Sequence, residues 1–166
     1  MNAETMSEIE RVCQEHEIKN LRFEVHWLYR SHVEKWRTYF KERGITLKIK
    51  MGVETFDDTF RREVFDKGME GVTPEEIAEV ADEVCLLFGI TGQTVASMEK
   101  DIAIGLSMFE RICVNIMVEN TTDIHPDEKV IANFVREIYP KYMDNPRVDI
   151  LLENTDFGVG KKGERE

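Results

Sequence analysis

The sequence has no long apolar run and a deficit of positive charge. Its 166 residues include 22 lysines and arginines against 33 aspartates and glutamates, which gives a formal net charge of −11. Such an excess of negative charge disfavours a nucleic-acid backbone or an anionic membrane as partner. No stretch approaches the ~18 apolar residues that a membrane helix needs, and the N-terminal MNAETMSEIE is too acidic for a signal peptide. We therefore expect a cytoplasmic protein that binds neither nucleic acid nor a membrane.

Cysteine is also scarce. The three cysteines, Cys13, Cys85 and Cys113, lie far apart in the sequence. A disulfide framework is typical of an even number of cysteines in a secreted chain, and a zinc or iron–sulfur site is typical of closely spaced pairs. We therefore expect three separate, buried thiols and no metal site in this chain.

Glycine and proline are few, with 10 and 4 residues, while 42% of the residues are apolar. This composition and length are typical of one globular domain with a sizeable core. The last residues are small and charged, so we expect a domain over residues 1–158 and a flexible polar tail over residues 159–166.

Five segments have the residue types and spacing of strands: NLRFEVHW, ITLKIKMGVE, EVCLLFG, RICVNIMVEN and RVDILLEN. The segments around them have helical spacing, which predicts helices over residues 5–16, 32–44, 56–68, 73–81, 94–109 and 126–139. The helix over 73–81 begins with Thr73, Pro74 and Glu76, the signature of a capping box. Strands that alternate with helices predict an α/β fold with a mostly parallel sheet of about five strands in βα repeats.

The predicted strands are not the continuous apolar runs of a sheet that helices cover on both faces. Polar residues interrupt them at period two: Arg22, Glu24, His26, Lys48, Lys50, Asn115 and Glu119. This pattern favours part of a (β/α) TIM-type barrel with a polar, ligand-holding concave side. Sites in such barrels lie at the carboxyl ends of the strands. The alternative is a polar face that simply meets solvent.

The same acid recurs where strands end. Glu54, Glu119 and Glu153 stand in the similar settings GVET, MVENTTD and LLENTD, and Glu24 lies in the first strand. Contact with solvent explains a polar residue at these points but not the repeated glutamate. We therefore treat the four glutamates as candidate ligand-binding residues, with a capped or salt-bridged strand end as the alternative for each.

The segment CLLFGITGQTVASM, residues 85–98, ends an apolar strand at Gly89 and adds Gly92, Gln93 and Thr94 before a helix begins. Glycines at such a turn let a ligand come close to the backbone, and the helix N-terminus offers free N–H groups. The turn lacks the third glycine of a dinucleotide-binding turn and the Gly-Lys-Ser/Thr of a phosphate-binding loop.

Several of these segments resemble the radical S-adenosylmethionine (radical SAM) enzymes. KIKMGVETFDDTFRREVFDKGM is similar to the fourth strand and following helix of that family, and CLLFGITGQTVASMEKDI is similar to its fifth strand. RICVNIMVENTT suits the sixth strand, while Thr91 stands where the family commonly has proline. The resemblance extends over roughly residues 20–154 and implies the C-terminal half of the family's partial TIM barrel.

The resemblance implies SAM as the cofactor, since carboxylates accept hydrogen bonds from ribose hydroxyls and a glycine backbone can lie against a flat ring. It implies Glu54 near the ribose, Gly89, Ile90 and Gly92 at the adenine with Gln93 behind it, and Glu119 and Asn120 facing the cofactor or substrate. Glu24, His26 and Glu153 are then candidates for the substrate. His26 could donate a proton, or be a structural histidine beside Trp27.

The Cys-x-x-x-Cys-x-x-Cys loop that holds the [4Fe–4S] cluster of this family is absent, as is its Gly-Gly-Glu-type stretch. We therefore expect the cluster only in a complete enzyme, a chain that is inactive alone, and either a homodimer or a missing N-terminal half as partner. The complete enzyme would cleave SAM reductively to a 5′-deoxyadenosyl radical that abstracts hydrogen from the substrate.

The sequence does not identify the substrate. Acidic side chains at several strand ends would suit an amine or a nitrogen-rich base, and the resemblance makes a queuine-salvage lyase one candidate within the family. The rival interpretation is a non-enzymatic βα module that binds a nucleotide-like ligand or a partner chain.

Overall fold

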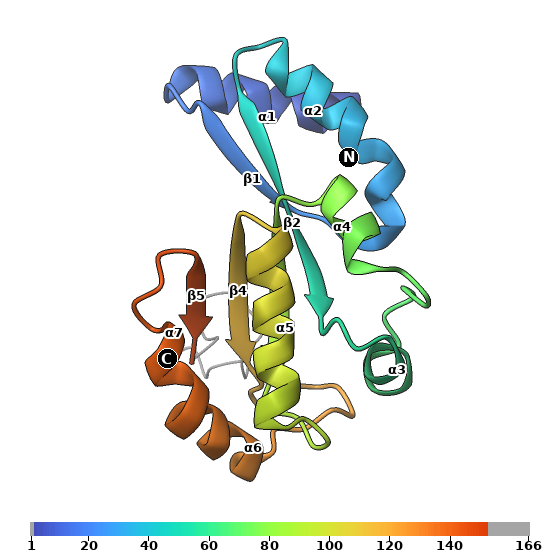
Figure 1. Ribbon diagram of the computed structural model, residues 1–166. Coiled ribbons are helices and arrows are strands. Elements are labelled where there is room, and N and C mark those ends of the chain that lie inside the picture. Colours follow the sequence, from blue (N-terminus) through green and yellow to red (C-terminus); the bar gives the residue numbers. More distant parts are fainter. Residues whose placement is uncertain (1, 153–166) are drawn as a thin grey trace, which may run out of the picture.

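Five parallel strands form one curled sheet in the computed structural model, which describes residues 2–152 (Figure 1). The strands are β1 (Asn20–Glu24), β2 (Thr46–Glu54), β3 (Glu83–Phe88), β4 (Arg111–Ile116) and β5 (Val148–Leu151). Each strand pairs with the next along the chain, so the spatial order is the sequence order. This half-barrel with alternating helices confirms the expected fold class. The predicted tail and Glu153 lie outside the described residues.

Helical segments connect the strands. They are α1 (Ala3–Glu15), the 3₁₀ helix η1 (Trp27–His32), α2 (Val33–Lys41), α3 (Asp58–Phe60), the π-helical turn η2 (Arg61–Phe65), α4 (Pro74–Val80), α5 (Val95–Met108), α6 (Glu128–Asn133), the π-helical turn η3 (Phe134–Ile138) and α7 (Tyr139–Tyr142). The predicted capping box of α4 is confirmed, because Thr73 Oγ1 accepts from the Glu76 N–H and Glu76 accepts from the Thr73 N–H. No helix among the described residues is long and apolar enough to cross a membrane.

The alternation along β2 separates two faces of the sheet. Leu47, Ile49, Met51 and Val53 are buried against the helices, while the side chains between them point to the other face and are only partly buried. In β3, Val84, Leu86 and Phe88 are fully buried. The helix α5 packs closely on β4, since a Cβ on Gly105 would lie only 2.6 Å from Ile112 Cγ2. The core therefore lies between the sheet and its helices, and the opposite, concave face is free to be polar.

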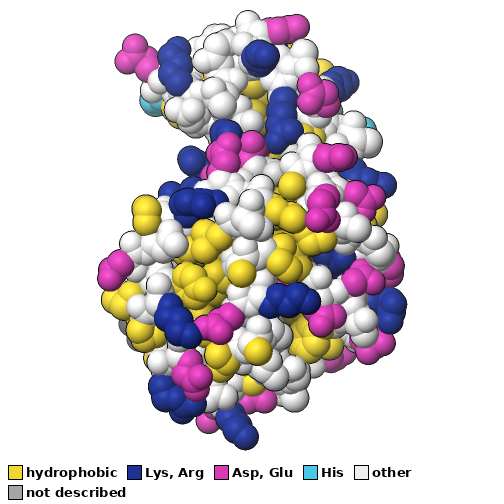
Figure 2. Space-filling view, viewed as in Figure 1, with side chains coloured by type: hydrophobic (Ala, Val, Ile, Leu, Met, Phe, Trp, Pro, Cys, Tyr) yellow, Lys and Arg dark blue, Asp and Glu magenta, His cyan; other side chains and the backbone are white. Residues whose placement is uncertain are grey.

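Figure 2 shows that lysines and arginines lie among aspartates and glutamates over the helix-covered side, with apolar side chains gathered over its middle. No block of a single charge marks this side as an electrostatic binding surface.

Two strands are shorter than the sequence predicts. The first strand ends at Glu24 rather than Trp27, and β4 ends at Ile116 rather than Asn120. The pairing of β1 with β2 ends at Glu24 and Lys50, after which His26 becomes the N-cap of η1: its Nδ1 accepts from the Leu28 N–H at 3.2 Å. A histidine that caps a helix satisfies a free backbone donor, so the expected alternation stops there.

Two predicted helices contain wider turns. The segment 56–68 is α3 followed by η2, and it ends at Asp66 in a left-handed conformation with φ 45°. The segment 126–139 is α6, η3 and α7, which extends to Tyr142 and includes Pro140. A proline lacks the N–H of the regular helical ladder, and a π-helical turn before it is one way to accommodate that loss.

Candidate functional site

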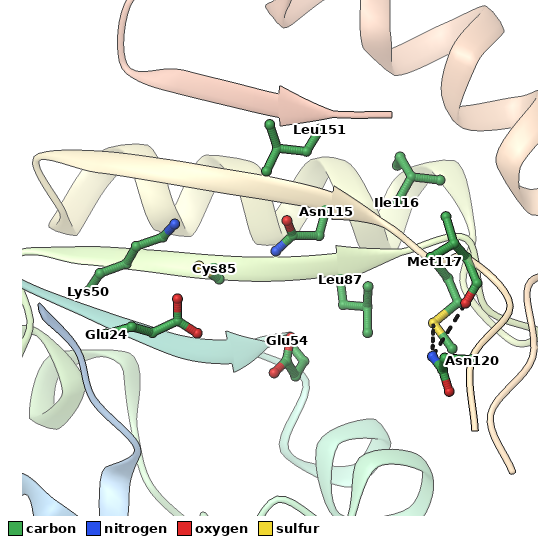
Figure 3. A pocket seen from close by; sticks show the side chains of 11 residues that line it. Glu24, Lys50, Glu54, Cys85, Leu87, Asn115, Ile116, Met117, Asn120 and Leu151 are labelled. Carbon is green, nitrogen blue, oxygen red and sulfur yellow. Dashed lines mark hydrogen bonds between the residues drawn. The ribbon is translucent and has the colours of Figure 1, made fainter. Parts of the chain in front are cut away.

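A cavity of about 330 Å³ lies on the concave face of the sheet (Figure 3). Side chains from all five strands and from the loop after β4 line it: Glu24, Lys50, Glu54, Cys85, Leu87, Asn115, Ile116, Met117, Val118, Asn120 and Leu151. It reaches the carboxyl ends of the central strands, which is where ligands bind in parallel sheets of this class. A polar concave side was expected, and this cavity is the part of it that a small molecule could enter.

Charged and amide groups occupy the floor of the cavity. Glu24 and Lys50 are register partners on β1 and β2, and Asn115 projects from β4 toward the same space (Figure 3). Burial of Lys50 works against its charge, but the neighbouring Cys85, Cys113 and Glu24 raise its pKa on balance. Lys50 is therefore a fixed cation beside the Glu24 carboxylate.

Glu54 stands at the end of β2 in a left-handed conformation with φ 68°. Such a backbone angle is costly for a residue other than glycine, and it is kept only where the surroundings impose it. Here Lys67 Nζ donates to Glu54 Oε1, and the two residues that follow Glu54 are held by Asp101 of α5. The carboxylate is thus aimed into the cavity by its backbone.

The rim of the cavity carries Met117 and Asn120. Asn120 Nδ2 donates to the Val118 carbonyl oxygen at 3.3 Å and lies 3.9 Å from Met117 Sδ (Figure 3). A thioether and an amide side by side offer one apolar and one hydrogen-bonding surface. The rim therefore suits a flat ring with polar edges.

Below the cavity, a row of alternating charges crosses the sheet near the amino ends of the strands. Arg22 Nε donates to Glu83 Oε1 at 2.8 Å, and Arg111 Nη2 donates to Asp149 Oδ1 at 2.6 Å. These pairs satisfy one another, so this end of the concave face is neutral and crosslinked.

The glycine turn after β3 packs against other parts of the chain. Gly89 and Gly92 have φ angles of 96° and 98°, which favour glycine. A Cβ on Gly89 would lie 2.7 Å from Ile131 Cγ1, and one on Gly92 would lie 3.0 Å from Phe60 Cε2. The side chains that come close to these two glycines therefore belong to the protein itself.

Gln93 closes the same turn. Its Oε1 accepts from the Ile90 N–H at 3.1 Å and its Nε2 donates to the Leu87 carbonyl oxygen at 2.8 Å. Ile90 is buried and forms a bridge to Pro126. None of Gly89, Ile90, Gly92 and Gln93 lines the cavity. They form the wall behind Leu87, which does line it.

The remaining candidates divide into three groups. Glu24, Glu54 and Asn120 come together in the cavity. Glu119 is exposed and pairs with His125 at 2.8 Å. His26 lines a neighbouring groove with Tyr29 and Trp36, and Glu24 lines both this groove and the cavity. Glu153 lies outside the described residues.

Sequence reasoning identified Lys50 and Asn115 only as polar interruptions, and it missed Cys85 and Met117 as lining residues. For the first two, the signal was present: each places a polar side chain in an otherwise apolar strand. The prediction that all three thiols are buried is confirmed. The prediction that they are separate is wrong for Cys85 and Cys113, which are register partners on β3 and β4. Separation in the sequence carries no information on which strands pair.

A comparison with solved structures finds a similar fold at a substantial level of identity. A queuine lyase from Clostridium spiroforme, solved with SAM and queuine bound, matches the chain with a TM-score of 0.85 and 39% sequence identity. The match covers 95% of this chain and 67% of that protein, of which it is the C-terminal part. No protein-family model and no curated protein sequence matches the chain.

Proposed function

The chain belongs to the radical SAM enzyme family, and we propose that its concave cavity binds SAM together with a nitrogen-rich base of the queuine type. The observation that carries the proposal is the match to the SAM- and queuine-bound lyase over 95% of this chain. The cavity supports it, because two carboxylates, two amides and one ammonium group converge there from β1, β2, β4 and the loop after β4. The complete protein would then be a radical SAM lyase in the cytoplasm.

The donor set of the cavity fits SAM. Glu54 offers a carboxylate to the ribose hydroxyls, and Asn120 with the Met117 thioether offers a surface to the adenine ring and its polar edge. We propose that Gly89, Ile90, Gly92 and Gln93 act behind this surface, by holding the turn that supports Leu87. Glu119 would contact the cofactor or substrate only if its ion pair with His125 were broken.

The floor of the cavity fits a substrate that carries both an amine and acceptor atoms. Glu24 would accept from the amine, while Lys50 and the Asn115 amide would donate to ring or hydroxyl acceptors. A base with donors and acceptors on its edge uses both kinds of group, whereas a purely apolar substrate would leave them unpaired at a cost of about 1–3 kcal/mol each. We propose His26 as a substrate contact from the neighbouring groove, which shares Glu24 with the cavity. Glu153, which is not among the described residues, stays a proposed substrate contact.

Bound SAM supplies carbon-radical chemistry in this family, and the residues of this chain would bind, orient and shield the reactants. The described residues do not fit an iron–sulfur cluster: they contain no group of three or more metal-ligating side chains, and Cys13 lies on α1, apart from the two strand cysteines. We therefore assign no step of the reaction to residues around a cluster. The part we assign to this chain is recognition of SAM and of the base.

Calorimetric titration of the folded chain with SAM, and separately with queuine, tests the proposal. We expect each ligand to bind. Glu54→Gln should lower the affinity for SAM at least about tenfold, and Glu24→Gln should lower the affinity for queuine at least about tenfold. A tenfold loss is expected when one charged hydrogen bond is removed. Glu70→Gln is the matched control, because Glu70 is an exposed glutamate outside the cavity and should leave both affinities unchanged.

Two results would overturn the proposal. One is a chain that is folded by circular dichroism and binds neither ligand at millimolar concentration. The other is binding that both cavity variants leave intact. A chain that binds queuine or another nucleotide-like ligand but does not bind SAM would instead support the non-enzymatic module.

A further inference from the structure

Two cysteines lie side by side on the concave face. Cys85 of β3 and Cys113 of β4 are direct partners in the parallel ladder, so their side chains project from the same face of neighbouring strands, which lie ~4.8 Å apart. Both thiols are free and buried, at 4% and 5% exposure, and Cys85 lines the cavity. The proposed binding of SAM and base gives neither thiol a part.

The surroundings favour a thiolate at this pair. A hydrogen bond from the Cys85 thiol lowers the pKa of Cys113 to about 7, although burial opposes this shift and the Lys50 ammonium adds to it. The same pairing raises the pKa of Cys85. When Cys113 is protonated, its Sγ instead donates to Asn115 Oδ1 at 3.8 Å. The pair can thus share one negative charge.

The other charged groups that face the pair come from the adjacent strands. Glu24 of β1 and Asp149 of β5 act against the thiolate, and the Arg111 side chain is held by Asp149. Glu83 lies two residues before Cys85 on the same face of β3, and its carboxylate is paired with Arg22. Lys50 is therefore the cation on which a thiolate at this position depends.

We propose that Cys85 and Cys113 form a reactive dithiol site that exchanges with small-molecule disulfides entering the cavity. The Cys113 thiolate attacks one sulfur of the disulfide, which forms a mixed disulfide and releases one thiolate. Cys85 then loses its proton to the solvent and attacks Cys113 Sγ, which releases the second thiolate. The two cysteines are oxidised by two electrons to a cross-strand disulfide, and the small disulfide is reduced to two thiols.

The strand geometry permits the second step. Disulfides join residues with Cα separations of about 4.4–6.8 Å, and neighbouring parallel strands meet this range. Attack is fastest when the thiol has a pKa near the ambient pH. Oxidation would remove the Cys85 thiol from the cavity wall and the thiolate from beside Lys50, so the state of the dithiol would change the floor of the ligand site.

Cys13 provides an internal control. It is 2% exposed on α1, and burial raises its pKa, so it is as buried as the pair but lacks a neighbouring thiol and cation. The reduced, folded chain should be incubated with 2-hydroxyethyl disulfide at neutral pH, quenched in acid, and examined by intact mass and peptide mapping.

We expect a chain lighter by two hydrogen atoms, with Cys85 linked to Cys113 and Cys13 unmodified. Cys85→Ser should retain one mixed disulfide at Cys113. Cys113→Ser should react at least about tenfold more slowly, because each unit of pKa changes the thiolate fraction near tenfold. Lys50→Met should also slow the exchange while circular dichroism reports an unchanged fold.

The proposal is overturned if Cys85 and Cys113 react no faster than Cys13, or if they react only when circular dichroism shows unfolding. An unchanged rate of disulfide exchange in Lys50→Met would contradict the claim that the thiolate depends on Lys50. Because the readout is the mass of the chain, these outcomes are independent of whether SAM or queuine binds.

Discussion

Asp101 on α5 accepts a hydrogen bond of 2.7 Å at Oδ2 from Thr55 Oγ1, the hydroxyl of the residue that follows β2. Asp101 Oδ1 also accepts from the Phe56 N–H at 2.9 Å, and both Thr55 and Asp101 are less than 5% exposed. One carboxylate in the helix layer therefore anchors the turn that directs Glu54 to the opposite face of the sheet.

Asp101→Ala should destabilise the fold by about 3 kcal/mol, because it leaves the buried Thr55 hydroxyl and Phe56 N–H without an acceptor. Asp101→Asn keeps an acceptor and should cost less. Denaturant unfolding of both variants measures the difference. Equal stability of Asp101→Ala and the parent chain would contradict the anchoring role.

Asp101 also makes stability depend on pH. Its burial outweighs the hydrogen bonds from Thr55 and Phe56 and raises its pKa in the folded chain above the ordinary value of an aspartate. The folded state then holds the proton more firmly than the unfolded state, so this contribution is full at low pH and is lost as the pH rises through the folded pKa. We expect Asp101→Asn to gain stability relative to the parent over that rise. A difference that stays constant with pH would contradict the raised pKa.

Gly89→Ala should destabilise the chain by about 2–4 kcal/mol, since it adds strain at a positive φ to a clash with Ile131. Gly44→Ala is the matched control: Gly44 has φ 71° but nothing within 4 Å of an added Cβ, so it reports strain alone. In an Ile131→Ala background the cost of Gly89→Ala should fall toward that of Gly44→Ala. Thermal or denaturant unfolding of Gly89→Ala, Gly44→Ala, Ile131→Ala and the Gly89→Ala, Ile131→Ala double variant measures these costs.

Disruption of the turn at Gly89 should also weaken the binding of SAM. We expect Gly89→Val, which carries a larger branched side chain to the same contact, to abolish measurable SAM binding in the calorimetric titration. Unchanged SAM affinity in a folded Gly89→Val chain would show that the turn does not support the ligand surface.

The edge of the sheet at β1 should promote association. Within the described residues β1 pairs only with β2, and Val25 donates its N–H to Lys50, so the alternate N–H groups, including that of Glu24, point away from the sheet. An open strand edge is a template for pairing with another chain. We expect light scattering at micromolar concentration to show dimers or larger species, and amide exchange at Glu24 to become slower as the protein concentration is raised. A monodisperse monomer would contradict this expectation.

Anaerobic reconstitution of this chain with iron and sulfide should give no stable [4Fe–4S] cluster. Three thiolates must converge to hold such a cluster, and only Cys85 and Cys113 are neighbours. Iron analysis and electron paramagnetic resonance after desalting provide the measurement. A stoichiometric cluster whose signal shifts with SAM would place the ligands within this chain.

The amino-acid sequence by itself determined the alternation that places Leu47 and Ile49 under helices and Lys50 on the opposite face, because side-chain direction in a strand has period two. It also determined the βα order, the capping box at Thr73 and the resemblance to radical SAM enzymes, since these depend on residues close together in the chain. Glu24 and Glu54, proposed from the strand ends, and Asn120, proposed from the resemblance, line one cavity.

Only the tertiary structure decided which distant residues meet. Cys85 and Cys113 became neighbours through the register of β3 and β4, and the space at Gly89 and Gly92 was filled by Ile131 and Phe60 from other elements. His26 left the sheet because β1 had no further pairing with β2 beyond Lys50 and a helix cap was available. Packing and strand register are properties of the assembled sheet, and no local pattern of residues contains them.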